Sequence, residues 1–138
     1  MDIKSINQRV RSLLASEELS APGESDRAAR LAVYAVATGE HLGMDSDQLI
    51  AIRLAAQLHR ITEIDDQLRQ LITKDETIRT IIRLSEAFDE RRFGSRGQAQ
   101  MSDRECLAWL NQQHGAEYPS EIVDALIAVQ SVIQPIGT

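Results

Sequence analysis

Cysteine, proline, glycine and aromatic residues are all scarce in this sequence, and each shortage excludes a class of protein. The 138 residues include one cysteine, Cys106, so an intramolecular disulfide is excluded and a reducing, cytoplasmic location is expected. Three prolines and seven glycines are too few for the many turns of a β-sandwich. Aromatic residues make up 4% of the chain and hydrophobic residues 43%, which predicts a core of Ala, Leu, Ile and Val in packed helices.

Two further shortages concern the partners of the protein. The net charge is −6, and this acidic balance does not supply the clustered basic surface of a nucleic-acid-binding protein, so we expect no nucleic-acid partner. No apolar run approaches the roughly 20 residues that a membrane-spanning helix needs, so we expect no membrane association.

Apolar residues recur at three- and four-residue steps along most of the chain, which is the pattern of amphipathic helices. The clearest stripe contains Ile50, Leu54, Leu58 and Ile61, and it predicts a central, buried helix over residues 49–61. Similar stripes predict helices over residues 3–19, 24–41, about 62–72, 73–88, 102–110 and 119–133. No segment alternates in the manner of a strand. The sequence therefore predicts an all-α fold, a compact bundle of about seven helices.

One break in this pattern divides the chain. Pro22 and Gly23 stop the first helix, because these two residue types are the strongest local breakers of regular structure. The break is short, so we expect residues 1–22 to form an N-terminal helix and linker that pack on the core. Residues 23–138 then form the main helical domain.

Helix-capping residues mark several of the predicted boundaries. Gly43 suits the position after a helix where a positive φ is needed, and Asp45 or Ser46 suits the N-cap of the next helix. Thr73 and Ser102 each begin the S/T-x-x-E pattern of a capping box.

Several segments resemble, in the correct order, the HD-GYP branch of the HD-domain phosphohydrolases. Residues 24–32 are similar to its opening His-Ser-x-Arg-Val-Ala-x-Leu-Ala, and residues 54–61 to its Ala-Ala-Leu-Leu-His-Asp-Ile. Residues 81–89 are similar to Ile-Ile-x-Val-Ala-Asp-x-Phe-Asp. Residues 101–105 and 118–125 resemble the closing Leu-Ser-x-x-Glu-Ala and Phe-Asp-Pro-x-Val-Val-Asp-Ala. The resemblance implies a shortened, HD-domain-like helical bundle.

Active members of that family use a centre of two or three metal ions to hydrolyse cyclic dinucleotides, and this sequence departs from their ligand set. Glu24 stands where the first metal-binding His is expected, Arg60 replaces the Asp of the His-Asp pair, and Glu86 stands at a metal-binding Asp. His59 is the one histidine at a matching position. The 26 residues between His59 and Glu86 leave no room for the intervening helices, their histidines and the Gly-Tyr-Pro loop. We therefore expect no metal, no cofactor and no catalytic residue at this vestigial metal site.

Arg60 has two interpretations. A guanidinium can replace the charge of a lost metal and bind carboxylates in a fork geometry, which predicts that Arg60 lies near Glu24, Glu86 or both. Alternatively, Arg60 extends from a helix end into solvent. His59 is likewise either a hydrogen-bonded histidine at the edge of the core or a ligand-binding group.

The densest basic run is a second candidate site. It consists of Arg79, Arg83, Arg91, Arg92 and Arg96. This run is either a patch that binds phosphate, a nucleotide or a partner, or it is a solvated helix face whose charge is balanced by nearby acids. Cys106 is expected in the core, and so is Trp109, for which an interface anchor is the alternative.

These observations predict a catalytically inactive HD-GYP-like domain that works by binding in bacterial signalling or regulation. Its expected partners are proteins, a second copy of the chain among them, whereas a cyclic dinucleotide is not favoured. The alternative is a residual metal-dependent phosphohydrolase or cyclic-nucleotide-binding domain that uses His59, Glu86 and the arginine run. A helical interaction protein unrelated to HD domains is a third hypothesis.

Overall fold

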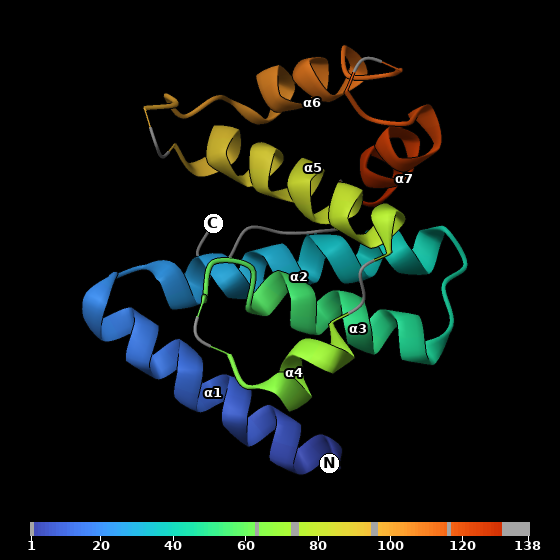
Figure 1. The fold of residues 1–138 in the computed structure, drawn as a ribbon. Helices are drawn as coiled ribbons and strands as arrows, with labels where there is room; N and C mark the ends of the chain where they lie inside the picture. The colour runs from blue at the N-terminus through green and yellow to red at the C-terminus, as the bar shows by residue number, and fades with distance from the viewer. Residues whose placement is uncertain (1, 63, 73–74, 95–96, 116, 131–138) are drawn as a thin grey trace.

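The computed structural model describes residues 2–62, 64–72, 75–94, 97–115 and 117–130, and these residues form an all-α protein (Figure 1). The described part of the chain contains seven helices and no strand, which confirms the predicted fold class. The helices are α1 (Ile3–Ser20), α2 (Glu24–His41), α3 (Ser46–Gln57), α4 (Asp66–Leu71), α5 (Glu76–Phe93), α6 (Asp103–Asn111) and α7 (Ser120–Gln130).

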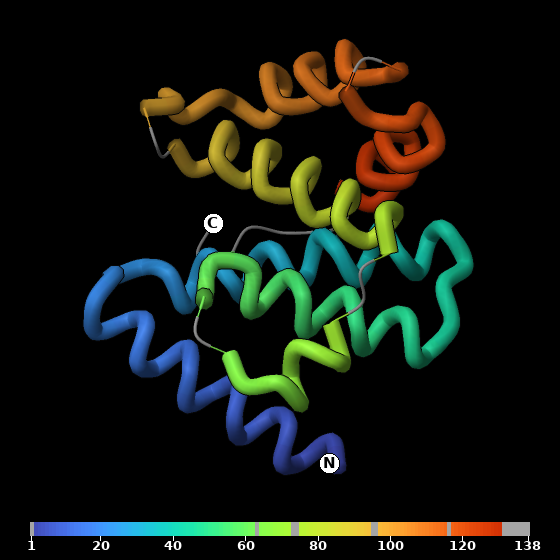
Figure 2. Tube along the Cα trace, in the orientation of Figure 1, coloured from blue at the N-terminus to red at the C-terminus, as the bar shows by residue number. Residues whose placement is uncertain are grey.

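Helix α2 is the centre of the fold, a position that the sequence had suggested for α3. It contacts α1, α3, α5 and α7, and in the trace of Figure 2 it runs between α1, α3 and α4 on one side and α5 to α7 on the other. Small residues on α2 allow this close approach. A Cβ added to Gly39 would lie 3.1 Å from the side chains of both Leu49 and Met44.

Two apolar clusters hold the helices together. The larger one lies between α2, α3, α5, α6 and α7 and includes the fully buried Leu31, Ile52 and Leu84. The smaller one joins α1 and α4 to the outer face of α3, and its buried members are Ile6, Val10, Leu54, Leu58 and Leu68. The N-terminal helix therefore packs on the rest of the chain through its own apolar stripe.

Capping residues fix several of the helix boundaries. Asp45 and Gln48 form a capping box before α3, and Ser102 and Glu105 form one before α6. Gly43 has φ of +82°, as its position after α2 requires. Asp75 caps α5 by accepting hydrogen bonds from Thr77 and Ile78, whereas the capping box predicted at Thr73 lies outside the described residues.

Three predicted boundaries are wrong. Helix α3 ends at Gln57, so His59 and Arg60 lie in a turn closed by a hydrogen bond from the Ile61 N–H to the Leu58 carbonyl, 3.0 Å long. Helix α4 begins at Asp66 after the cap of Asp65, later than predicted. Helix α5 continues past Phe88 to Phe93, because Asp89 and Arg92 are buried against its neighbours, and it ends at Gly94.

Helix length and hydropathy also bear on membrane association. Within the described ranges, no helix is both long and apolar enough to cross a membrane.

Candidate functional site

The structure brings Glu24, His59, Arg60 and Glu86 together, and we call this cluster, with Arg27, the charged junction. Glu24 begins α2, Glu86 lies in the middle of α5, and the turn after α3 supplies His59 and Arg60. Each of α2, α3 and α5 contacts the other two, which brings these segments together. The early end of α3 matters here, because both side chains of the turn reach α5.

Glu86 is the most heavily contacted member of the charged junction. Its Oε2 lies 3.0 Å from Nε2 of His59 and 3.4 Å from Nε of Arg60. The same oxygen accepts a hydrogen bond from Nη2 of Arg27. One carboxylate therefore binds three basic side chains from two parts of the chain.

Glu24 completes the arrangement from the other side. Its Oε1 accepts a hydrogen bond from Nη1 of Arg27 at 2.9 Å, and its Oε2 accepts one from Nη1 of Arg60 at 3.4 Å. Glu90, one turn beyond Glu86, lies 3.6 Å from Nη2 of Arg60. Two guanidiniums thus lie between three carboxylates, and the contact predicted between Arg60 and both acids is present.

Arg27 is the member of the charged junction that the sequence analysis did not single out. Its side chain is 8% exposed, which makes it more buried than the side chain of Arg60 at 21%. Two signals pointed to it: Arg27 follows Glu24 at the i, i+3 spacing of a helical ion pair, and it lies in the first segment that resembles HD-GYP proteins.

The electrostatics of the charged junction favour full ionisation of Glu86. The hydrogen bond from His59, with the positive charges of His59, Arg27 and Arg60, lowers the pKa of Glu86 to about 2 against the opposing effect of burial. An ionised carboxylate accepts hydrogen bonds only, so Nε2 of His59 carries a proton. Burial lowers the pKa of Arg27, and the charge of Arg60 lowers it further.

A second charged cluster lies one turn along the same helix pair. Asp89 is 3% exposed and accepts two hydrogen bonds from Arg30, from Nε at 2.8 Å and from Nη2 at 3.1 Å. The hydroxyl of Tyr34 donates to the same carboxylate at 3.2 Å, and burial raises the pKa of that hydroxyl. Because Arg30 binds both oxygens of Asp89, this cluster fixes the register of α2 on α5.

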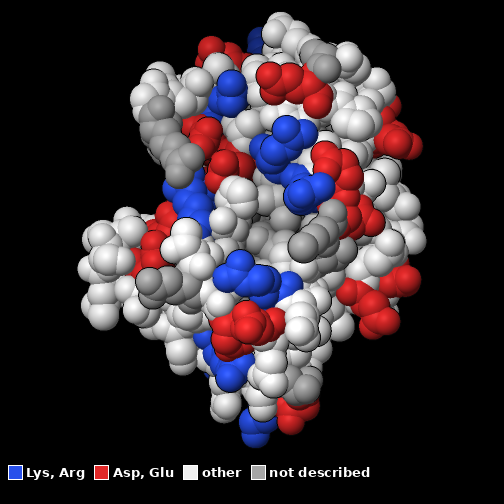
Figure 3. All heavy atoms as spheres, in the orientation of Figure 1, with Lys and Arg blue, Asp and Glu red and all other residues white. Residues whose placement is uncertain are grey.

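The four described arginines of the basic run do not form one surface. Arg79 and Arg83 are exposed on α5, and Arg96 lies outside the described residues. The guanidinium carbon of Arg91 lies 4.0 Å from the centre of the half-buried Trp109 ring, and that of the buried Arg92 lies 5.5 Å from the centre of the Phe88 ring. On the face drawn in Figure 3, basic and acidic side chains are interspersed rather than separated.

The single cysteine lies in the core, as expected. Cys106 is 1% exposed, and burial raises the pKa of its thiol, which disfavours the nucleophilic thiolate.

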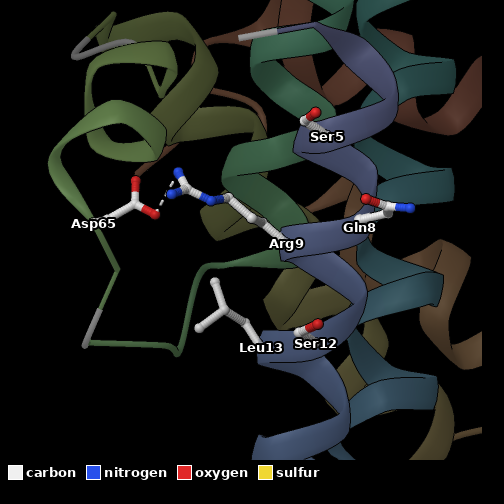
Figure 4. Close-up of a pocket in the computed structure, with 6 residues that line it drawn as sticks. All are labelled: Ser5, Gln8, Arg9, Ser12, Leu13 and Asp65. Atoms are coloured by element: carbon white, nitrogen blue, oxygen red, sulfur yellow. Dashed lines mark ion pairs between the residues drawn. The ribbon is translucent and has the colours of Figure 1, made fainter.

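A concavity of about 520 Å³ lies between α1 and the segment before α4 (Figure 4). Arg9 points across it to Asp65, with 2.7 Å between Nη1 and Oδ2, and the same nitrogen donates to Gln67. Its other labelled polar side chains, on Ser5, Gln8 and Ser12, are neutral. Among the described residues that line this concavity, the charges of Arg9 and Asp65 are matched to each other, so they offer little to recognise a charged ligand.

The donor set of the charged junction does not fit a metal centre. The carboxylates of Glu24 and Glu86 are bound to guanidiniums, which would have to leave before a cation entered. No group of three His, Cys, Asp or Glu side chains within the described ranges is arranged to hold a metal ion.

Comparison with known proteins adds no family assignment. No protein-family model matches the chain, and neither a curated protein nor a solved structure matches it.

Proposed function

We propose that this chain is a catalytically inactive, HD-GYP-like regulatory or signalling module that acts by binding a protein partner. The observation that supports it most is the position of two guanidiniums, of Arg27 and Arg60, between the carboxylates of Glu24 and Glu86. These are positions at which the sequence resembles the metal-binding segments of the family.

In this proposal the arginines do the structural work of metal ions. A metal centre joins helices by neutralising acids that converge from different segments, and a guanidinium supplies the same charge with directed hydrogen bonds. The single side chain of Arg60, in the turn after α3, contacts acids on both α2 and α5. The charged junction would then stabilise the bundle and leave its surface to bind a partner.

A residual metal-dependent phosphohydrolase is the competing function, and the pair of His59 and Glu86 is the observation that favours it. In an active site, an acid hydrogen-bonded to a histidine is a common means of orienting the imidazole. Here the same acid also binds two arginines, so its charge is already neutralised.

Metal titration separates the two functions. Calorimetry of the purified, chelator-treated protein with Mn²⁺ and Fe²⁺ should show no binding at micromolar concentrations, and no hydrolysis of a cyclic dinucleotide should follow. One metal per chain, lost in a His59→Ala variant, would contradict the proposal. Sedimentation velocity on the same sample tests whether the partner is a second copy of the chain.

A further inference from the structure

A half-open cleft lies between α3, α4 and α5, and His59 of the charged junction forms part of its wall. Its volume is about 580 Å³, within the range of roughly 300–1,000 Å³ that is typical of small-molecule sites. Aliphatic side chains make up most of its wall: Ala55, Leu58, Ile64, Ile72, Ile78 and Ile82. Four of these six are isoleucines, and they belong to three different segments.

The remaining described residues of the wall are all basic: His59, Arg69, Arg79 and Arg83. No acidic side chain belongs to the wall as far as the structure describes it. Glu76 is 2.6 Å from Arg79, but both side chains are more than half exposed, so this pair is screened by solvent. Arg83 lies over the Tyr118 ring, with 5.7 Å between its guanidinium carbon and the ring centre. The described wall of the cleft therefore combines an apolar surface with basic side chains from three segments.

The two kinds of residue restrict the ligand. Arginine binds carboxylates and phosphates through paired hydrogen bonds, so the polar end of the ligand is an anion. A nucleobase is usually held by stacking on aromatic side chains, and the described wall has none. A wall of isoleucine and leucine suits a flexible aliphatic chain.

We propose that this cleft binds a monomeric, single-chain aliphatic anion, such as a fatty acid or an alkyl phosphate. The chain lies against Ile64, Ile72 and Ile82, and the head group binds Arg79 and Arg83. This inference goes beyond the proposed function and does not depend on it, because the cleft would bind its ligand whether or not the charged junction holds metal.

Calorimetric titration with ten-carbon probes below their micelle concentrations tests the proposal. Decanoate and decyl phosphate should each bind with one molecule per chain, and their relative affinities identify the preferred head group. Acetate, which has the head without the chain, and decyltrimethylammonium, which has the opposite charge, should not bind. Equal binding of the cationic probe, tighter binding of AMP than of decanoate, or uptake only above the micelle concentration would overturn the proposal.

Two variants locate the site. The double variant Arg79→Gln, Arg83→Gln should bind the anionic probes about tenfold more weakly, since it removes charged hydrogen bonds to the head group. The control Arg11→Gln, Arg104→Gln makes the same change in net charge at exposed positions outside the cleft and should bind within about twofold of the parent. Equal losses in the two double variants would mean non-specific attraction and would overturn the proposal.

The third variant addresses the apolar part of the cleft. Ala55→Met extends a side chain into the cavity and should abolish decanoate binding while the helical circular dichroism spectrum stays unchanged. Retained decanoate binding in this folded variant would place the ligand elsewhere and contradict the proposal.

Discussion

The charged junction and the cleft both include His59 and use successive parts of α5, yet they differ in how their charges are matched. In the charged junction, Arg27 and Arg60 contact Glu24, Glu86 and Glu90 within a partly buried space. At the cleft, Arg79 pairs with Glu76, which is not part of the described wall, and both side chains are more than half exposed. We therefore expect the ion pairs in the first region to contribute to the free energy of unfolding, and the exposed cations in the second to contribute little to it and to be available for a ligand.

The largest expected effect is the loss of Glu86. Glu86→Ala leaves two buried or half-buried guanidiniums and His59 without their shared carboxylate, which should reduce the free energy of unfolding by about 3 kcal/mol. Urea denaturation followed by circular dichroism measures this change in the free energy of unfolding. Glu76→Ala, which removes an exposed acid from the same helix, is the matched control and should cost no more than about 0.5 kcal/mol. Similar losses in both variants would remove the distinction between the two regions.

A smaller loss is expected from Arg60. Arg60→Met keeps the aliphatic part of the side chain and removes the charge that Glu24, Glu86 and Glu90 share, at a cost of about 1–2 kcal/mol. The effect is smaller than that of Glu86→Ala, because Arg60 contacts its acids at 3.4–3.6 Å and Arg27 still binds two of them. The exposed Arg11→Met serves as control in the same denaturation experiment and should change the stability by less than about 0.5 kcal/mol.

Acid should weaken the charged junction in a defined pH range. The folded pKa of Glu86 is lowered to about 2 from its ordinary value of 4.5, so its stabilising contribution is complete above pH 4.5 and is lost as the pH falls towards 2. In Glu86→Gln, which has no titratable group at this position, the loss of stability between pH 4.5 and pH 2 that is due to Glu86 should disappear. Urea midpoints measured between pH 6 and pH 3 for parent and variant check this, and parallel curves would contradict it.

The smallest expected effect concerns the cleft itself. Arg83→Gln removes an exposed cation whose one described contact is the face of Tyr118, so the stability should change by less than about 0.5 kcal/mol. A loss near 2 kcal/mol in thermal or urea unfolding would show that Arg83 is a structural residue rather than a ligand-binding one.

Local sequence signals predicted much of the fold. The bounds of α2 were predictable because Pro22 and Gly23 precede it and Gly43 follows it. The starts of α3 and α6 were predictable because Asp45 and Ser102 are capping residues, each with a Gln or Glu three residues later. The end of α3 was not predictable in this way. The apolar stripe continues to Ile61, which suggests a longer helix, whereas residues 58–61 form a turn. In this turn His59 and Arg60 contact Glu86 of α5, and such tertiary contacts are not visible in the local sequence pattern.

The candidate site was predictable only in part. The resemblance of separate segments to one family put Glu24, Arg60 and Glu86 in the same site, but the sequence left open whether Arg60 meets the acids or extends into solvent. The structure shows the contacts. The cleft had no such signal, because residues 55–83 line it from three segments whose spacing in the sequence does not indicate their positions in space. For the basic run, the sequence left open a binding patch or a solvated helix face, and neither interpretation predicted that Arg91 and Arg92 contact aromatic rings.

A pair of double-mutant cycles tests the central claim, that matched charges in the charged junction stabilise the fold and charges at the cleft do not. The cycle of Arg27→Met with Glu86→Gln should give a coupling energy of at least about 1 kcal/mol, and the cycle of Arg79→Met with Glu76→Gln should give no more than about 0.5 kcal/mol. A coupling energy near zero for Arg27 and Glu86, or equal values in the two cycles, would contradict the account.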